Sequence, residues 1–282
     1  MAERSILDVT GGHVNVDSTG SEVKASLKKE VIPGQCCIPP PFCDYQGLGT
    51  EETWNSMPVY ITTPKSPTSS AVLIISDIYG WQVPQTRLLA DKIAAAGHYV
   101  VVPDFMENDF FGSSDPNDEY AGLPEYLARH SMSKAIAEAK EILRKIQDMG
   151  FNSIGGAGFC WGTKILVSLL KGDTPLAAAI MCHPSFITND EMKEVKVPLV
   201  VLGAEIDIVT AAAQVMEYGA ILHDNAAIVG SESYVKIYKG ADHGWTTRYN
   251  LNDVEARNRA ETAHEEIIAW FKNRLSNPTA AL

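Results

Sequence analysis

The chain lacks the features that mark several large classes of protein. None of its apolar runs approaches the roughly 18 residues that a membrane-spanning helix needs. It has no run of basic residues, and its net charge of -12 disfavours nucleic acids and anionic membranes as partners. Its N-terminal segment lacks the basic start and apolar region of a secretory signal, so we expect a cytoplasmic protein.

Cysteine is also scarce. The chain has five cysteines, and this small, odd number favours free thiols in a reducing compartment over a disulfide framework. Cys36, Cys37 and Cys43 cluster in "CCIPPPFC", but neither a second C-x-x-C pair nor a nearby histidine accompanies them. We therefore expect no metal site, and nothing in the sequence requires an organic cofactor.

What the chain does have is apolar material for a sizeable core. It contains 282 residues, of which 45% are hydrophobic. Residues 1–50 hold scattered Gly, Pro and Ser and are predicted to be an N-terminal extension of uncertain order. Residues 51–282 are predicted to form one domain, either as a monomer or as a homodimer.

Apolar runs alternate with helical patterns along this domain. "MPVYITTP" (57–64) predicts an edge strand, while "AVLIIS" and "VPLVVLGA" predict strands buried on both faces. One long helix is predicted around 125–148. Such alternation is typical of an α/β fold with a mostly parallel central sheet and helices on both faces. Ligands in these folds bind at the carboxyl ends of the strands.

Glycines surround one thiol in "GGAGFCWGT" (155–163). Gly158, Cys160 and Gly162 form a G-x-C-x-G pattern between a predicted strand and a predicted helix. This is the nucleophile-elbow pattern with sulfur in place of the serine oxygen. The glycines are expected where side chains would collide, and the N–H of Trp161 is placed to donate to an oxyanion. The alternative is a buried structural cysteine in a glycine-rich turn.

A base and an acid follow at later strand ends. "GAEID" offers Glu205 and Asp207, and "ADHGW" offers His243. Nucleophile, acid and histidine in this chain order match the α/β-hydrolase arrangement. Asp207 is favoured over Glu205 because it lies further into its loop. His183, in "MCHPSF", precedes any acid, so it is predicted to be a pocket-wall or structural histidine.

The motifs "GFCWGT", "GAEID" and "ADHGW", together with "IISDIYGWQ" and "HGWTTR", resemble the dienelactone hydrolase family of the α/β-hydrolase superfamily. The resemblance runs from about residue 57 to 275. It implies an α/β-hydrolase fold and the catalytic triad Cys160, Asp207 and His243. It also implies an oxyanion hole formed by the N–H groups of Ile78 and Trp161.

The same resemblance assigns roles to residues near these motifs. Asp77 stands where well-known members have a glutamate that pairs with the resting thiol, and it is one methylene shorter. Arg248 matches an arginine associated with binding a substrate carboxylate. Aromatic residues that flank the motifs are expected to wall the pocket: Tyr79, Trp81 and Trp245.

The sequence therefore predicts a cysteine-dependent hydrolase of small-molecule lactones or esters that works through a thioester. Two other functions stay open. A low-pKa thiol also suits a detoxifying or redox protein. A ligand-binding module that keeps the fold without turnover is the third possibility, although it has no need of all three triad residues.

Overall fold

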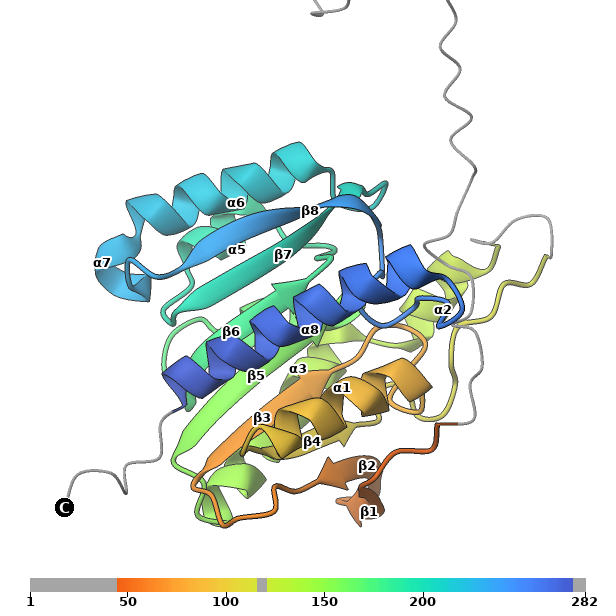
Figure 1. Ribbon diagram of the computed structural model, residues 1–282, viewed down its shortest axis with the longest axis vertical. Helices are drawn as coiled ribbons and strands as arrows, with labels where there is room; N and C mark the ends of the chain where they lie inside the picture. Colours follow the sequence, from red (N-terminus) through yellow and green to blue (C-terminus); the bar gives the residue numbers. More distant parts are fainter. Residues whose placement is uncertain (1–44, 116–120, 276–282) are drawn as a thin grey trace, which may run out of the picture. The chain divides into compact units, whose positions relative to one another are not determined.

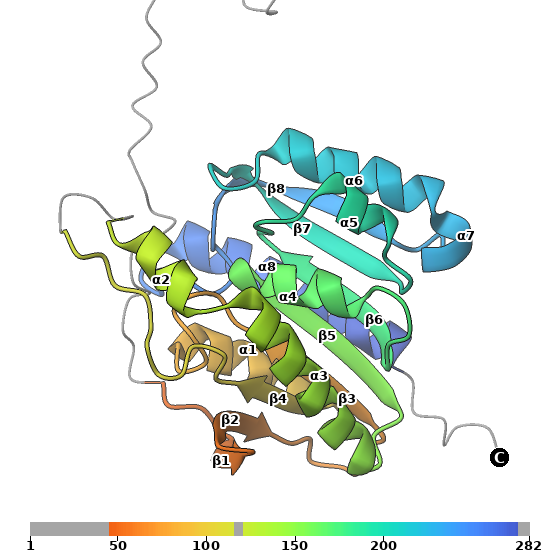
Figure 2. The same ribbon diagram turned by 180° about the vertical axis from the view of Figure 1, so that it is seen from behind.

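The computed structural model describes residues 45–115 and 121–275. They form a central sheet with helices on both faces, as Figures 1 and 2 show from opposite sides. The sheet has eight strands in the order β1-β2-β4-β3-β5-β6-β7-β8. Strand β2 is antiparallel to both of its neighbours, and the other neighbouring pairs are parallel. The predicted alternation of strands and helices is confirmed.

The bounds of the elements follow the predicted segments closely. The strands are β1 (Thr50–Trp54), β2 (Met57–Thr62), β3 (Ser70–Ile75), β4 (Tyr99–Pro103), β5 (Ser153–Phe159), β6 (Leu176–Cys182), β7 (Leu199–Ile206) and β8 (Tyr234–Asp242). The helices are α1 (Pro84–Ala95), α2 (Leu123–Arg129), α3 (Met132–Asp148), α4 (Trp161–Leu169), α5 (Asn189–Lys193), α6 (Ala212–Asp224), α7 (Ala226–Val229) and α8 (Val254–Arg274).

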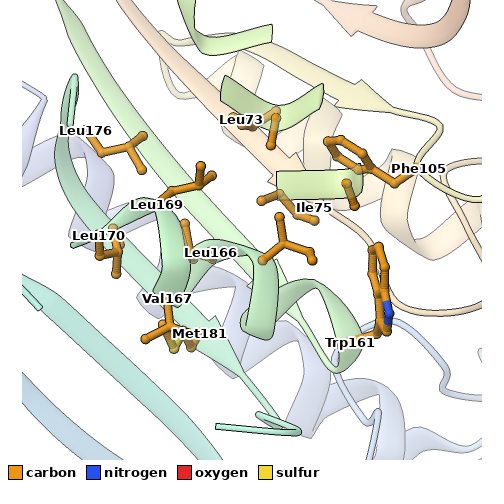
Figure 3. Packing of buried hydrophobic residues seen from close by; sticks show 14 of the residues in the cluster. Leu73, Ile75, Phe105, Trp161, Leu166, Val167, Leu169, Leu170, Leu176 and Met181 are labelled. Atoms are coloured by element: carbon orange, nitrogen blue, oxygen red, sulfur yellow. The ribbon is translucent and has the colours of Figure 1, made fainter. Parts of the chain in front are cut away.

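The sheet separates two apolar cores. Helices α1 and α8 pack together on one face, and α3, α4, α5 and α6 cover the other. Strand β3 contributes side chains to both cores, because successive side chains point to opposite faces of the sheet. Leu73 and Ile75 pack in one core, and Val72 and Ile74 pack in the other. Burial of each such side chain stabilises the fold by about 1.5–3 kcal/mol. Figure 3 shows part of the first core, where Trp161 lies at the start of α4.

The strand over 57–62 is not at the edge of the sheet, which corrects the sequence analysis. Strand β1 precedes it and pairs with it through a two-residue hairpin turn. Asn55 and Ser56 form this turn with φ values of 49° and 69°, the left-handed conformation that such turns require. The segment "TEETW" is exposed up to Trp54, so it shows no alternation of apolar and polar residues. That is why its sequence did not predict a strand.

The long helix predicted around 125–148 is two helices. Helix α2 ends at Arg129, and α3 begins at Met132. Between them Ser131 caps α3, and its side chain accepts a hydrogen bond from the backbone N–H of Lys134 at 3.5 Å. His130 is buried and contacts Asp109 at 3.0 Å. The apolar periodicity continues across this break, so it predicted one element.

Most of the predicted N-terminal extension lies outside the described residues, as do Cys36, Cys37 and Cys43. The described part begins with a segment that binds α1. The hydroxyl of Tyr45 and the backbone N–H of Leu48 donate to the carboxylate of Asp91 at 2.5 and 2.8 Å. Asp91 also accepts from the buried Tyr60 hydroxyl on β2 at 2.6 Å. The boundary near residue 50 stays a prediction.

The turn between β5 and α4 has the sharp geometry of a nucleophile elbow. Cys160 has φ 50° and ψ -115°, a conformation that is costly for a residue with a side chain. A Cβ at Gly162 would lie 2.2 Å from the backbone oxygen of Ile75 on β3. A Cβ at Gly158 would lie 3.0 Å from the backbone oxygen of Gly162. The glycines therefore permit the start of α4 to approach the sheet.

We predict that Gly162→Ala destabilises the protein by more than about 2 kcal/mol, because the new methyl group overlaps a backbone carbonyl that cannot move away. Gly112→Ala is the matched control, since no atom lies within 4 Å of a Cβ at that position. Its expected effect is within about 0.5 kcal/mol. Chemical denaturation of both variants measures the difference. Equal effects would show that the elbow does not depend on Gly162.

Candidate active site

Five adjacent strands carry the predicted site residues at their carboxyl ends. In the sheet these strands follow one another in the order β3-β5-β6-β7-β8. The residues that follow them are, in the same order, Asp77, Cys160, His183, Asp207 and His243. Because the strands are parallel, these side chains meet at one edge of the sheet.

Asp207 and His243 form a buried pair. Nδ1 of His243 lies 3.0 and 2.9 Å from the two carboxylate oxygens of Asp207. Their side chains are 2% and 1% exposed. One oxygen of Asp207 also accepts from the backbone N–H groups of Val209 and Thr210 at 2.8 and 3.0 Å. These bonds orient the carboxylate, which in turn directs Nε2 of His243 away from Asp207.

The pKa of His243 reflects its burial and its two neighbours, Cys160 and Asp207. Burial lowers the pKa of His243, but the Cys160 thiolate and Asp207 raise it more, to about 9. Nε2 has no partner at ordinary hydrogen-bond geometry among the described residues, so this buried atom is available to exchange a proton with a neighbouring sulfur. Cys160 is itself 7% exposed. The sulfur of Cys160 therefore faces a histidine whose protonated form is favoured.

His183 lies against His243 without sharing its charge. Its ring is 5.2 Å from the ring of His243 and 5.4 Å from that of Trp245, edge to face in both cases. Nε2 of His183 contacts the hydroxyl of Thr246 at 2.7 Å. Burial, and then the charges of His243 and Arg248, lower its pKa well below the usual value. His183 is therefore a neutral packing partner, and Trp245 lies behind it in the core of the α1 and α8 face.

Asp77 and Arg248 form a second buried pair beside the first. The guanidinium Nε of Arg248 lies 3.2 Å from Asp77, and the two side chains are 2% and 1% exposed. Asp77 also accepts from the Tyr79 N–H at 2.9 Å and the Thr247 hydroxyl at 3.3 Å. Burial raises the pKa of Asp77, while these partners act to lower it. The guanidinium lies over the Tyr79 ring at 5.1 Å, so Arg248 is an interior residue.

The backbone N–H groups of Trp161 and Ile78 are the predicted oxyanion donors. Trp161 is the first residue of α4, where the N–H groups have no partner within the helix. Ile78 follows β3, and its carbonyl accepts from the Phe111 N–H and the Tyr126 hydroxyl, both at 3.0 Å. Within the described ranges, neither the Ile78 nor the Trp161 N–H donates a hydrogen bond. Both N–H groups are thus available to donate a hydrogen bond to an anionic oxygen.

Trp81 does not join this group, which corrects the sequence analysis. Its ring stacks on the guanidinium of Arg87 from α1 at 4.9 Å, and it is 2% exposed in the core beneath that helix. The chain turns back toward α1 after Tyr79, so the two aromatic residues face different surroundings. Only Tyr79 lies with the Asp77 and Arg248 pair.

Sequence reasoning missed two residues that contact Cys160. The hydroxyl of Ser185, in the loop after β6, donates toward the sulfur of Cys160 at 3.7 Å. The hydroxyl of Thr163 donates to the carbonyl of Cys160 at 2.5 Å. Thr163 directly follows the elbow motif, so its position in the sequence could have indicated this contact. Ser185 carried no such signal, because only the folded sheet brings its loop to Cys160.

The described ranges contain no group of His, Cys, Asp and Glu that could hold a metal ion. No helix within them is long and apolar enough to cross a lipid bilayer.

The eight-stranded sheet and the cysteine elbow define an α/β-hydrolase fold. The model of the dienelactone hydrolase family matches residues 57–275, and the chain belongs to that family. It is a carboxylic-ester hydrolase.

Individual relatives agree with this assignment. A human carboxymethylenebutenolidase homolog is 29% identical over 87% of this chain and 98% of its own. An endo-1,3;1,4-beta-D-glucanase from Zea mays is 36% identical over 55% of this chain, and the match covers 49% of the maize protein. A crystal structure of a putative dienelactone hydrolase from Klebsiella pneumoniae shares the fold, with a TM-score of 0.65 and 18% identity. That alignment covers 79% of this chain and 98% of the bacterial one.

We predict that Asp207→Asn lowers kcat by about 10³-fold or more while the protein stays folded, because an amide favours the wrong tautomer of His243. Glu205→Gln is the matched control. Glu205 is exposed and accepts only from the backbone N–H of Gly240 at 2.8 Å among the described residues. Ester hydrolysis assays compare the two variants. The reverse order of effects would transfer the role of the acid to Glu205.

We expect the ring of His243 to lose its proton near pH 9, and an NMR titration measures this midpoint. Cys160→Ala should move this midpoint down by roughly one pH unit or more, since burial then opposes the charge with only Asp207 in its favour. The imidazolium is therefore present below pH 9 in the wild type and is lost above it. The exposed His223 provides control resonances remote from the mutation. An unchanged midpoint in the variant would mean that Cys160 carries no charge beside His243.

Proposed function

We propose that the protein hydrolyses small esters or lactones through a thioester on Cys160, with Cys160, His243 and Asp207 as its catalytic triad. The observation that carries this proposal is the buried contact between His243 and Asp207 beside Cys160. Nδ1 of His243 lies 2.9 Å from Asp207, and the pKa of His243 is raised to about 9, so its imidazolium is able to stabilise a thiolate at Cys160 and to protonate a leaving group.

The reaction begins when the Cys160 thiolate attacks the substrate carbonyl carbon. The carbonyl π electrons move onto oxygen, and the N–H groups of Ile78 and Trp161 stabilise that oxyanion. Its collapse forms the thioester and expels an alkoxide, which takes a proton from Nε2 of His243. Nε2 then removes a proton from water, whose attack releases the acid and regenerates the thiolate. In a lactone the alcohol stays tethered to the acyl group, so only hydrolysis releases product.

In this proposal Asp77 does not take the role of the glutamate that pairs with the resting thiol in well-known dienelactone hydrolases. Its carboxylate is bound by Arg248 at 3.2 Å, by Tyr79 and by Thr247. We therefore assign formation of the thiolate to His243. The same ion pair holds the negatively charged carboxylate of Asp77 beside the guanidinium, which weakens the attraction of Arg248 for a substrate carboxylate. Binding of such a carboxylate by Arg248 stays a prediction.

The name of the maize relative raises glycoside hydrolysis as a second activity. That reaction uses two carboxyl groups on either side of the scissile bond. The buried carboxylates near Cys160 are Asp77 and Asp207, and each is paired with a cation, Arg248 and His243 respectively. A thiol between a paired acid and histidine favours acyl transfer instead.

Turnover assays with variants at Cys160 test the proposal. We expect Cys160→Ser and Cys160→Ala to lower kcat/KM for p-nitrophenyl acetate by about 10³-fold or more. Iodoacetamide should inactivate the wild type by labelling Cys160 first. Cys182→Ala is the matched control: Cys182 is the other free thiol of the described residues, and burial raises its pKa. Activity that disappears as a different cysteine is labelled would contradict the proposal.

A substrate panel then separates the remaining possibilities. Lactones and esters with and without a free carboxylate are compared under steady-state conditions. Multiple turnovers indicate a hydrolase, a single burst indicates a thiol that is merely acylated, and binding alone indicates a receptor. A preference for the free carboxylate that Arg248→Ala abolishes would establish the carboxylate site.

A further inference from the structure

The loop after β6 contacts Cys160. This loop, "HPSF" (183–186), brings the hydroxyl of Ser185 to 3.7 Å from the sulfur of Cys160. Ser185 is fully buried. We propose that Ser185 is a further catalytic residue, whose hydroxyl donates a hydrogen bond that stabilises the Cys160 thiolate. The inference rests on the proposed role of Cys160 as nucleophile.

Hydrogen bonds with Thr163 hold the backbone of Ser185 beside the elbow. The backbone N–H of Ser185 donates to the hydroxyl oxygen of Thr163 at 3.0 Å, and that hydroxyl donates to the carbonyl of Cys160 at 2.5 Å. Thr163 therefore ties the loop to the elbow. Two residues of the loop have left-handed backbones, His183 with φ 40° and Phe186 with φ 60°. Such strain persists where the surroundings hold it, often at functional sites.

The sulfur is the one acceptor that the Ser185 hydroxyl contacts among the described residues. A buried hydroxyl requires a partner, and a negatively charged acceptor makes a stronger bond than a neutral one. The hydrogen bond therefore favours the thiolate over the thiol. When the thiolate attacks a carbonyl, its electron pair forms the S–C bond and its charge passes to oxygen. Ser185 therefore stabilises the Cys160 thiolate before the attack, in the resting enzyme.

Ser185 supplies a donor that the charged groups around Cys160 do not replace. His243 is the cation that faces the sulfur, and His183 stays neutral because its pKa is lowered. Several other charged groups of the surrounding loops and helices are paired. They are Asp207 with His243, Asp77 with Arg248, and Lys164 on α4 with Glu191 on α5.

The test is the rate of Cys160 alkylation by iodoacetamide from pH 5 to pH 10. We expect Ser185→Ala to slow alkylation about three- to tenfold at pH 7 and to raise the pH of half-maximal rate. At high pH the rates of variant and wild type should converge, because the thiol is then ionised without help. A merely structural role for Ser185 would lower the rate at every pH or leave it unchanged.

Ser168→Ala is the matched control. Ser168 lies on α4, and its hydroxyl donates to the backbone carbonyl of Lys164 at 3.0 Å, away from the sulfur. Thermal melting establishes that each variant folds, and Ser185→Gly removes the same hydroxyl if Ser185→Ala does not fold. A folded variant with an unchanged pH profile overturns the inference, as does an equal shift in Ser168→Ala.

The two proposals fail in different ways. If Cys160 of the wild type is not the first thiol alkylated, or if its alkylation leaves turnover intact, the proposed function fails and the role of Ser185 fails with it. If Cys160 is reactive and essential but Ser185→Ala matches the wild type at every pH, only the role of Ser185 is overturned.

Discussion

The close approach of helix α4 to the end of strand β3 is the constraint on which the rest of the site depends. A side chain at Gly162 would meet the carbonyl of Ile75 at 2.2 Å, so the two backbones are nearly in contact. Because α4 begins so near the sheet, Cys160 must turn sharply, with φ 50°. The chain beyond Ile75 then brings the Ile78 N–H to the same edge as the Trp161 N–H. One backbone contact thus helps to shape both the nucleophile turn and the pair of amide donors.

Buried charge at this edge is arranged in pairs. Asp207 is bonded to His243, and Asp77 to Arg248, with all four side chains at most 2% exposed. An unpaired charge at that depth would be strongly destabilising, because the interior cannot solvate it. The pairing leaves Cys160 as the group whose ionisation His243 can compensate.

How far the site could be predicted depended on whether its residues carried a local pattern. Cys160 and His243 lie in short motifs, and their chain order with Asp207 is typical of one fold. Trp81 also lies in such a motif, yet it packs on Arg87 under α1. Ser185 lies in no motif, yet it contacts the sulfur at 3.7 Å. A residue next to a motif is close to the site along the chain, but it need not be close in space. Contact with Cys160 depends on which loops the aligned strands bring to its side.

The sequence by itself determined the alternation of strands and helices, the glycine-lined turn at Cys160 and the chain order of Cys160, Asp207 and His243 at successive strand ends. These are local properties, since apolar periodicity and the steric freedom of glycine act over a few residues. Only the tertiary structure decided that Arg248 is buried against Asp77, that His183 packs edge to face on His243, and that the β6 loop reaches the sulfur. Each of these depends on contacts between different strand ends, because only the register of the folded sheet brings them together.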